Sequence, residues 1–217
     1  MSTTTPPAYF ILQSKAKSFE AVMERYVSPV SPILEKYEGQ VIVFSAAPQV
    51  LEGNWDGNWA VVVQFPSMER AQAFYNSAEY HPLHDLRINE LTEDSRALLV
   101  EGMDTTDMST AGTPAYFMVQ VKAPSLDELT QRYAVFVFPI LAQYEGQMIA
   151  GSATPQVLEG DWDGNWAAIL RFPSMERAQA WYHSTEYQPY RDLRINELTV
   201  DGRIVLAEGM DEGDSAH

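Results

Sequence analysis

The sequence predicts an α+β protein made of two ferredoxin-like domains, each with the element order βαββαβ, whose antiparallel sheets pack into one intramolecular barrel. The first observation is an internal repeat, in which Pro7-Ala-Tyr-Phe10 returns as Pro114-Ala-Tyr-Phe117 and the match continues without insertion or deletion to Met210. Roughly 60 of about 97 aligned positions are identical. The second is that each copy alternates β-rich runs with helical periodicity. A sheet with helices on one face needs a cover on the other, and the second copy supplies it.

The repeat divides the chain into a first domain at residues 7–103, a linker at 104–113 and a second domain at 114–210. The linker is rich in Ser, Thr and Gly, so we expect a flexible coil with an r.m.s. span of roughly 18 Å. This reach allows the two copies to pair with each other. It does not forbid pairing with another chain, so we expect an intramolecular pseudo-dimer and leave a further homodimer open.

Each copy is expected to begin with a central strand, at Ala8–Lys15 in the first copy, and to continue with a helix that starts at a capping serine. In the second copy Ser125 is followed three residues later by Glu128, which is the pattern of a capping box. Proline has no backbone N–H and clashes with the preceding turn, so Pro29 and Pro32 should kink or break the last turns of this helix in the first copy.

A second strand is expected at about Gln40–Ala46 and a third at Trp59–Phe65. The dipeptide Asp56-Gly57 between them is a strong tight-turn pattern, so the connection is expected to be a hairpin turn. The segment Asn54–Asn58 also resembles the start of a calcium loop. Its glycine comes too early for a calcium loop and the distal Glu is missing, so the hairpin turn is favoured.

The remainder of the first copy predicts a helix, a further helical segment and a closing strand. Ser67 is expected to cap a helix at Met68–Asn76, and a second helical segment is expected at Glu79–Leu91. The last strand is placed at Arg96–Glu101. This order gives a four-stranded antiparallel sheet with its helices on one face.

Composition excludes several classes of function. The formal net charge of −16 repels phosphate backbones and anionic lipid surfaces, so neither nucleic acid nor membrane is an expected partner. The chain has no cysteine, which excludes disulfides, thiolate metal sites and a cysteine nucleophile. The N-terminal residues lack the basic and apolar regions of a signal peptide, so a cytoplasmic location is expected.

Several ordered motifs occur in both copies. In the first copy they are Tyr37-x-Gly39, Leu51-Glu-Gly53-x-Trp55, Phe65-Pro-Ser67, Tyr75-x-Ser77-x-Glu79-Tyr80, Leu86-Arg87 and Glu101-Gly102. These motifs resemble the family called domain of unknown function 1330. The resemblance implies the dimeric α/β-barrel superfamily, whose members include monooxygenases, isomerases, cyclases and haem proteins, usually with a pocket beside each sheet. Relatives often carry arginines on the second strand, where this chain has Gln40 and Phe44-Ser-Ala46, so an anion site formed by those arginines is not expected here.

Candidate catalytic residues are a tyrosine, a glutamate and an arginine from each copy. They are Tyr75, Glu52 and Arg87 in the first copy and Tyr182, Glu159 and Arg194 in the second. Both tyrosines lie where a helix faces the sheet, and a buried phenol needs a hydrogen-bond partner, which the Glu or Arg of the same copy would supply. A Glu–Tyr pair suits proton transfer in an isomerase, cyclase or hydrolase. The alternative is a purely structural role, with a satisfied Tyr and a surface Glu–Arg pair.

Candidate ligand-binding residues are mainly aromatic. They are Tyr9, Trp55, Trp59, Tyr80, Tyr116, Phe138, Gly151, Trp162, Trp166, Trp181, His183 and Tyr187. The tryptophan pairs form either an aromatic ligand wall or core packing at a strand entrance. His81 and His84 have a spacing that can hold a metal or haem on a helix, but Pro82 lies between them and the second copy lacks both, so no metal site is expected.

Differences between the copies point to the pocket more selectively than their shared residues. On the first helix Pro29 becomes Phe136 and Ser31 becomes Phe138, whereas on the second strand Val43 becomes Ala150 and Phe44 becomes Gly151. Bulk has moved from the strand to the helix. If these positions face each other, volume is conserved while the cavity is reshaped, so the copies are expected to hold pockets of different shape.

Together these observations predict a small-molecule-binding protein. Its enzymatic version is a cofactor-independent isomerase, cyclase or monooxygenase acting on an apolar carbonyl or phenolic metabolite. A non-catalytic binding or stress-associated module and a haem-binding protein are the alternatives. Pocket polarity discriminates between the first two, because an enzyme should point a buried titratable group into its cavity.

Overall fold

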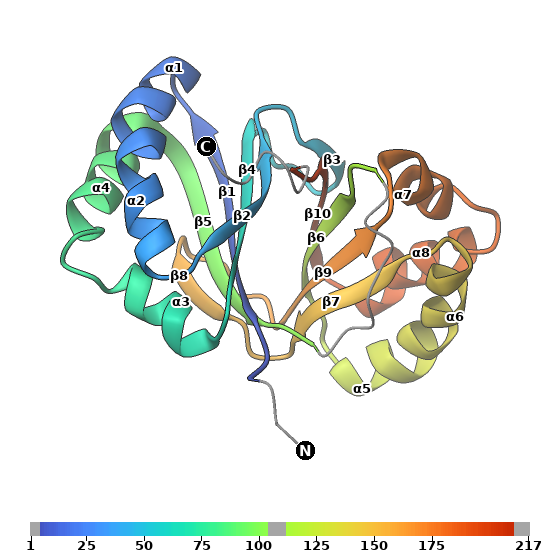
Figure 1. Ribbon diagram of the computed structural model, residues 1–217. Coiled ribbons are helices and arrows are strands. Elements are labelled where there is room, and N and C mark those ends of the chain that lie inside the picture. The colour runs from blue at the N-terminus through green and yellow to red at the C-terminus, as the bar shows by residue number, and fades with distance from the viewer. Residues whose placement is uncertain (1–4, 104–111, 211–217) are drawn as a thin grey trace.

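The computed structural model describes residues 5–103 and 112–210, which fold into two similar halves (Figure 1). The first half contains β1 (Ala8–Ala16), α1 (Phe19–Val22), η1 (Met23–Val27), α2 (Ser28–Lys36), β2 (Gln40–Ser45), β3 (Gln49–Glu52), β4 (Trp59–Phe65), α3 (Met68–Tyr75), α4 (His81–Leu86), η2 (Arg87–Leu91) and β5 (Thr92–Glu101). The second half contains β6 (Ala115–Lys122), α5 (Leu126–Leu129), η3 (Thr130–Ala134), α6 (Val135–Gln143), β7 (Gln147–Ser152), β8 (Gln156–Glu159), β9 (Trp166–Phe172), α7 (Met175–Tyr182), α8 (Gln188–Leu193), η4 (Arg194–Leu198) and β10 (Asp201–Glu208).

The strands form two five-stranded antiparallel sheets. Sheet A has the order β2-β4-β1-β5-β8 and sheet B the order β3-β10-β6-β9-β7. In sheet A, Ile11 of β1 faces Val62 of β4 on one side and Leu98 of β5 on the other. The first strand is therefore central, as its apolar character on both faces predicts.

Each sheet receives one short strand from the opposite half. The strand β8 pairs with β5, and β3 pairs with β10. The predicted hairpin at Asp56-Gly57 is therefore wrong, because the segment before that turn leaves its own sheet and pairs with the other. Four residues are too few to show a strand period, and the pairing partner lies in the other copy, so neither short strand was predicted.

The protein has a layered core in which helices cover the outer faces of both sheets and the inner faces pack against each other (Figure 1). The inter-sheet core contains apolar residues from both halves, including Ile11, Leu98 and Ile169. Isolated bridges from Val43 to Gly209 and from Gly102 to Ala150 join the sheet margins. The predicted barrel formed by two ferredoxin-like halves is confirmed. The predicted linker falls largely on residues 104–111, outside the described residues, and the exact domain division stays a prediction.

The first helix of each half begins at a serine cap and contains a π-helical segment, η1 in the first half and η3 in the second. The Oγ atoms of Ser18 and Ser125 accept hydrogen bonds from backbone N–H groups three residues later. The Glu128 side chain does not complete the predicted capping box and instead pairs with Arg132. The prolines do not break the helix, since α2 follows η1 directly and continues to Lys36 with Pro29 in its first turn and Pro32 in its interior. A kink at these prolines stays a prediction.

The loop between β3 and β4 is held by local contacts. Gly53 has φ +90°, which favours glycine, whereas Gly57 lies flat against the Trp55 ring and has no room for a Cβ. The Asn58 side chain bonds the backbone of Ala16, and Asp56 pairs with Lys15. The residues of the calcium-like pattern therefore anchor this loop to the end of β1.

The remaining predicted elements agree with the structure within a few residues. Ser67 caps α3, and α4 continues into η2 through the predicted helical segment. The last strand is longer than predicted, because β5 begins at Thr92. No helix within residues 5–103 and 112–210 is long and apolar enough to span a membrane.

Candidate functional site

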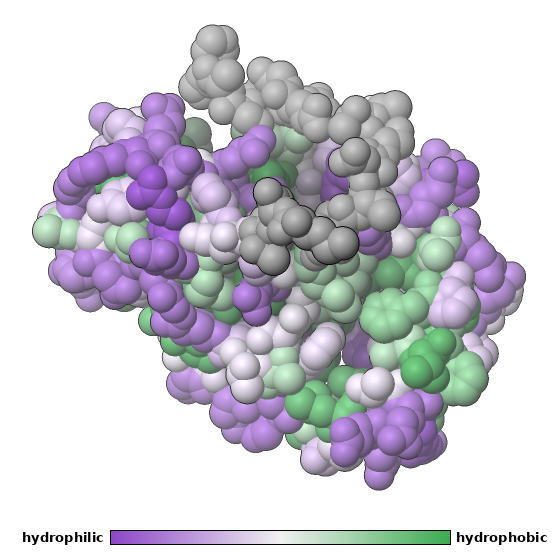
Figure 2. Space-filling view, turned by 60° about the horizontal axis from the view of Figure 1, so that its bottom comes forward, coloured by the Kyte–Doolittle hydropathy of each residue, from purple (hydrophilic) through white to green (hydrophobic). Residues whose placement is uncertain are grey.

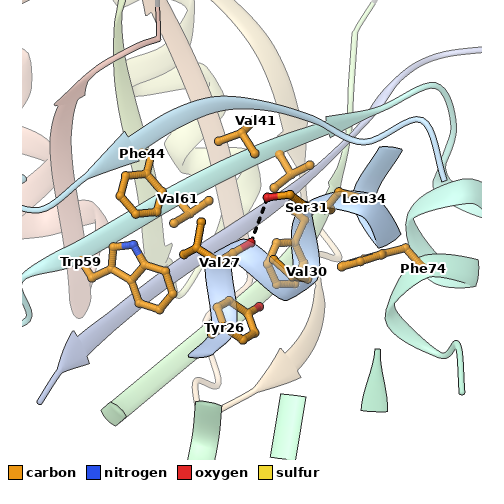
Figure 3. A pocket seen from close by; sticks show the side chains of 12 residues that line it. Tyr26, Val27, Val30, Ser31, Leu34, Val41, Phe44, Trp59, Val61 and Phe74 are labelled. Carbon is orange, nitrogen blue, oxygen red and sulfur yellow. Dashed lines mark hydrogen bonds between the residues drawn. The ribbon is translucent and has the colours of Figure 1, made fainter. Parts of the chain in front are cut away.

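An apolar pocket lies between the first helix and the outer face of sheet A. It has a volume of about 60 Å³ and is lined by Phe10, Tyr26, Val27, Val30, Ser31, Leu34, Val41, Phe44, Trp59, Val61, Val63 and Phe74. Figure 3 shows the helix side chains facing those of β2 and β4 across this space, with Phe74 at one end. The alternation of β4 places Trp59, Val61 and Val63 on this face of the sheet, because side chains two apart share a face.

An outer groove of about 370 Å³ is continuous with this pocket. The two share Val27, Ser31, Leu34, Val41 and Phe44. The groove adds Met23, Glu35, Gly39 and Gln40, together with Met210 from the end of the second half. Glu35 and Gln40 are exposed, so the site grades from a polar rim to an apolar interior.

Aromatic rings form one wall of the pocket. Phe44 and Trp59 meet edge to face with centroids 6.0 Å apart, and Phe19 meets both rings at 6.4 Å. Tyr26 also meets Trp59 edge to face at 5.9 Å. Such a wall favours planar, weakly polar ligands, because ring edges and faces attract each other.

The second half replaces two residues that face each other across this pocket. Its counterparts of Ser31 and Phe44 are Phe138 and Gly151. A Cβ on Gly151 would lie only 3.1 Å from the Sδ of Met148 and 3.5 Å from the Trp166 ring, so side chains of the second half occupy the space above this glycine. The sequence predicted that side-chain volume differs between the copies on both the helix and the strand. For Ser31 and Phe44 these differences lie at one cavity, the apolar pocket of the first half.

The other two substitutions lie elsewhere. Val43 is fully buried in the inter-sheet core, as is its counterpart Ala150, so this pair does not line the pocket. Pro29 is exposed, and its counterpart Phe136 stacks on Tyr190 with ring centroids 5.4 Å apart. The expectation that all four positions face one pocket is therefore wrong for these two. Adjacent strand residues point to opposite faces, which separates Val43 from Phe44, and Pro29 lies on an exposed side of α2.

A polar cluster lies on the same side of sheet A, near β8. The carboxylate of Glu159 accepts a hydrogen bond from Arg87 at 2.5 Å and from the Tyr75 hydroxyl at 3.3 Å. The Tyr75 hydroxyl also lies 3.0 Å from Nε2 of His84. Arg87 is fully buried and the Glu159 side chain is 3% exposed.

The second half contains the matching cluster with one change. Glu52 accepts hydrogen bonds from Arg194 at 2.5 Å and from Tyr182 at 2.9 Å. Arg191 occupies the position of His84 and donates to the backbone carbonyl of Tyr182. A histidine is thus present in the first cluster only.

The glutamates pair across the two halves, not within them as predicted. Glu52 lies on β3 and reaches Tyr182 and Arg194, whereas Glu159 lies on β8 and reaches Tyr75 and Arg87. The sequence identified the residue types correctly but assigned each glutamate to the wrong cluster, because the strand exchange was not predicted.

The environment of the tyrosines opposes ionisation. Burial, and then the negative charge of Glu159, raise the pKa of Tyr75. Burial, and then Glu52, raise the pKa of Tyr182 in the same way. Both phenols therefore remain protonated donors at neutral pH. Neither is among the residues that line the pocket, although Tyr75 packs against the lining residue Phe10 with ring centroids 6.1 Å apart.

The other predicted ligand residues are distributed over four places. Only Trp59 lines the described pocket. Tyr9, Trp55, Tyr116 and Trp162 lie in the inter-sheet core, so Trp55 and Trp59 occupy opposite faces of the sheet and do not form one wall. Beneath the helices, the hydroxyls of Tyr80 and Tyr187 bond those of Tyr26 and Tyr133, Trp181 stacks on Tyr187, and Trp166 is half-buried. Phe138 and His183 are exposed.

The donor set around the pocket does not fit haem. A haem iron needs an axial His, Cys, Met or Tyr. The inner pocket offers Tyr26, whose hydroxyl is bonded to Tyr80, and the groove adds Met23 and Met210, but methionine ligates haem iron beside a histidine and neither lining contains one. His84 pairs with Tyr75 and Asp85. The described residues contain no cluster of three or more His, Cys, Asp or Glu side chains that could hold a metal ion.

Several functional candidates were missed from the sequence. Tyr26, Val27 and Val30 of the first helix line the pocket, but they appear in the sequence only as an apolar helical stripe. Four polar residues beside the inter-sheet core, the buried Gln13 and Gln120 and the half-buried Arg96 and Arg203, also gave no local pattern. Polar residues at alternating strand positions do predict a polar layer once the buried face is known.

Comparison with known proteins identifies relatives by family and by fold. The sequence model of the family described as "Domain of unknown function (DUF1330)" matches residues 7–103 and again 114–210. A search of the curated proteins found no match. Among solved structures, an anthrone oxidase-like protein has a TM-score of 0.61 at 11% identity, covering 96% of this chain and 92% of that chain.

A mutant chlorite dismutase from Candidatus Nitrospira defluvii has a TM-score of 0.57 at 11% identity, with 96% of this chain and 93% of that chain covered. At this identity the likeness concerns the fold alone. The protein therefore has the dimeric α/β barrel fold, with both halves of the barrel in one chain.

Proposed function

The chain belongs to the DUF1330 family, as a tandem duplication of its domain, and we propose that it binds a small, largely apolar aromatic or carbonyl compound in the first half. The observation that carries the proposal is the aromatic-walled pocket that opens into a groove of about 370 Å³. This volume lies within the usual range for small-molecule sites. One structural neighbour is named as anthrone oxidase-like, and anthrone is an aromatic ketone, so that name is consistent with this ligand class.

The asymmetry between the halves supports a single principal site. Ser31 leaves space beside the Phe44–Trp59 wall, whereas Phe138 and Gly151 change both sides of the corresponding region. A ligand shaped to the first pocket would therefore meet a different surface in the second. The two halves therefore share a fold but differ in the residues at these two pocket positions.

Binding is better supported than catalysis. The titratable groups that line the pocket and groove are Tyr26, which is bonded to Tyr80, and Glu35, which is exposed at the rim. An enzyme usually points a perturbed, accessible acid or base into its cavity. An isomerase, cyclase or monooxygenase reaction would instead need Tyr75 and His84, which are bonded to each other and line neither the pocket nor the groove.

The test is a substitution that places the phenylalanine of the second half, Phe138, at the matching position of the first half, Ser31. We expect Ser31→Phe to weaken binding of 1-naphthol or acetophenone at least about tenfold, because the ring fills the space that the ligand needs. Titration calorimetry measures the Kd. Ser31 is exposed, so the free energy of unfolding should change by no more than about 0.5 kcal/mol.

The matched control is Phe138→Ser, which opens the corresponding position in the second half and should leave the measured Kd unchanged. Tyr75→Phe is a second control, since that hydroxyl lies outside the pocket. The proposal fails if Ser31→Phe binds the probes as tightly as the unchanged protein. Equal weakening by both phenylalanine–serine exchanges would contradict the single-site assignment.

A further inference from the structure

A polar layer of two buried glutamines and two half-buried arginines adjoins the apolar core between the two sheets. Gln13 and Arg96 are cross-strand neighbours in sheet A, and Gln120 and Arg203 are cross-strand neighbours in sheet B. Each shares a strand face with residues of the inter-sheet core, so the four side chains belong to the interface between the halves. Both glutamines are fully buried.

The contacts of this layer cross from one half to the other. Arg96 donates from Nη1 to Oε1 of Gln120 at 3.0 Å, and Arg203 donates from Nη1 to Oε1 of Gln13 at 3.5 Å. The Arg96 guanidinium also lies 5.5 Å from the centre of a Trp162 ring, and that of Arg203 lies 5.2 Å from a Trp55 ring. Each arginine is thus positioned by residues of the opposite half.

Hydrogen-bond donors outnumber acceptors in this layer. A guanidinium has no acceptor, so the glutamine oxygen must face it and the amide nitrogen must find its own acceptor. The Nε2 atoms of Gln13 and Gln120 are buried and have no hydrogen-bond partner within the described ranges. Buried donors without partners are uncommon in folded proteins and indicate a missing acceptor.

Positive charge in the layer is also uncompensated at close range. Within residues 5–103 and 112–210, neither Arg96 nor Arg203 has a carboxylate oxygen within 4.0 Å. The nearby carboxylates that act on both arginines, Asp94 and Asp201, have exposed side chains. Burial, and then the charge of Arg96, lower the pKa of Arg203 to about 10.

We propose that this layer is a binding site for one small monovalent anion, a halide or a small carboxylate, held between Arg96 and Arg203 and bonded by the amides of Gln13 and Gln120. An anion supplies the acceptor that both amides lack and reduces the repulsion between the two guanidinium groups. The site contains residues of both halves and lies away from the apolar pocket, so it does not rest on the proposed function. Its role would be to join the two sheets at their interface.

The test is thermal unfolding in different anions at constant ionic strength. Sodium gluconate, whose anion is too large for a buried layer, is exchanged for sodium chloride or sodium acetate from 0 to about 50 mM. We expect the Tm to rise with the logarithm of the anion concentration above the Kd, by roughly 3 to 10 °C at about 10 to 100 times the Kd. The anion that raises the Tm at the lower concentration identifies the preferred chemistry. Non-specific binding is disfavoured by the net charge of −16.

Arg203→Gln removes one cation and should abolish the rise in Tm, whereas Arg70→Gln, which removes an exposed arginine, should retain it. The ³⁵Cl NMR line width of the unchanged protein gives a second readout that does not depend on a variant folding. We expect protein-dependent broadening that acetate reverses. Identical Tm values in all three anions, a retained rise in Arg203→Gln, or an unbroadened chloride line would overturn the proposal.

Discussion

At the residue scale, the faces of the strands decide which side chains can act together. Trp55 and Trp59 are four residues apart in the sequence, yet one lies in the inter-sheet core and the other lines the pocket. Phe44 and Ser31 are far apart in the chain and face each other across that pocket. Residue type alone identified many of the candidate side chains, but their environments came from the sheet they belong to.

Tyr9 should make stability depend on alkaline pH. Burial, followed by the nearby Tyr116, raises its pKa to about 12 from an ordinary value of about 10. Between these values the unfolded chain has released the proton and the folded protein has kept it, so stability falls as pH rises. The slope from this residue approaches about 1.4 kcal/mol per pH unit.

We therefore expect Tyr9→Phe to lose less stability than the unchanged protein between pH 10 and pH 12. Urea unfolding at a series of pH values measures the difference. Tyr37→Phe is a suitable control, because Tyr37 is only half-buried and lies at the end of a helix. Parallel pH profiles for the Tyr9→Phe variant and the unchanged protein would show that the ring is accessible to water.

At the element scale, the exchanged strands β3 and β8 are held by buried ion pairs. Glu159 of β8 forms an ion pair with Arg87 beside sheet A, and Glu52 of β3 forms one with Arg194 beside sheet B. Burying such a pair is costly in itself, so it is weak evidence for stability. Removing one partner is different, because the remaining arginine is left buried without a counter-charge.

Glu159→Gln is expected to lower the free energy of unfolding by about 3–5 kcal/mol, and Glu52→Gln by a similar amount. The exposed pair Lys36–Glu79 provides the control, since Glu79→Gln should cost no more than about 1 kcal/mol. Urea titration followed by tryptophan fluorescence gives all three values. If Glu159→Gln costs no more than Glu79→Gln, the ion pair does not hold β8.

At the scale of the whole molecule, the two halves depend on each other. Each sheet takes its fifth strand from the other half, and the inner faces of both sheets are buried only by mutual packing. Apolar surface also remains on the second half, where Val135, Phe136 and Phe138 of α6 are exposed. Figure 2 shows apolar patches among hydrophilic side chains on the face in view. A further homodimer stays a prediction that native mass spectrometry can measure.

A chain made of residues 1–110 should not behave as a stable monomer. Its β3 would have no β10 to pair with, and residues such as Ile11 and Val62 would be exposed. We expect a homodimer in which two copies exchange β3, with stability that increases with protein concentration. Analytical ultracentrifugation and concentration-dependent melting check this. A folded monomer at micromolar concentration would contradict the interdependence of the halves.

The sequence by itself determined the repeat, the order of the main elements, the serine caps and the α+β class. These features follow from local rules, since strand alternation, helical spacing and caps involve residues close together in the chain. It also located the change of bulk at Ser31 and Phe44, because the duplicated copies can be compared position by position.

Only the tertiary structure decided the strand exchange and everything that depends on it. The partner of Tyr75 is Glu159, 84 residues away, and Arg203 meets Gln13 across 190 residues. Both halves carry the same Gln-Val-Leu-Glu segment, so pairing within a copy and pairing between copies look alike in sequence. Their difference lies in which sheet edge each segment reaches, and that is fixed by the packing of the two sheets as a whole.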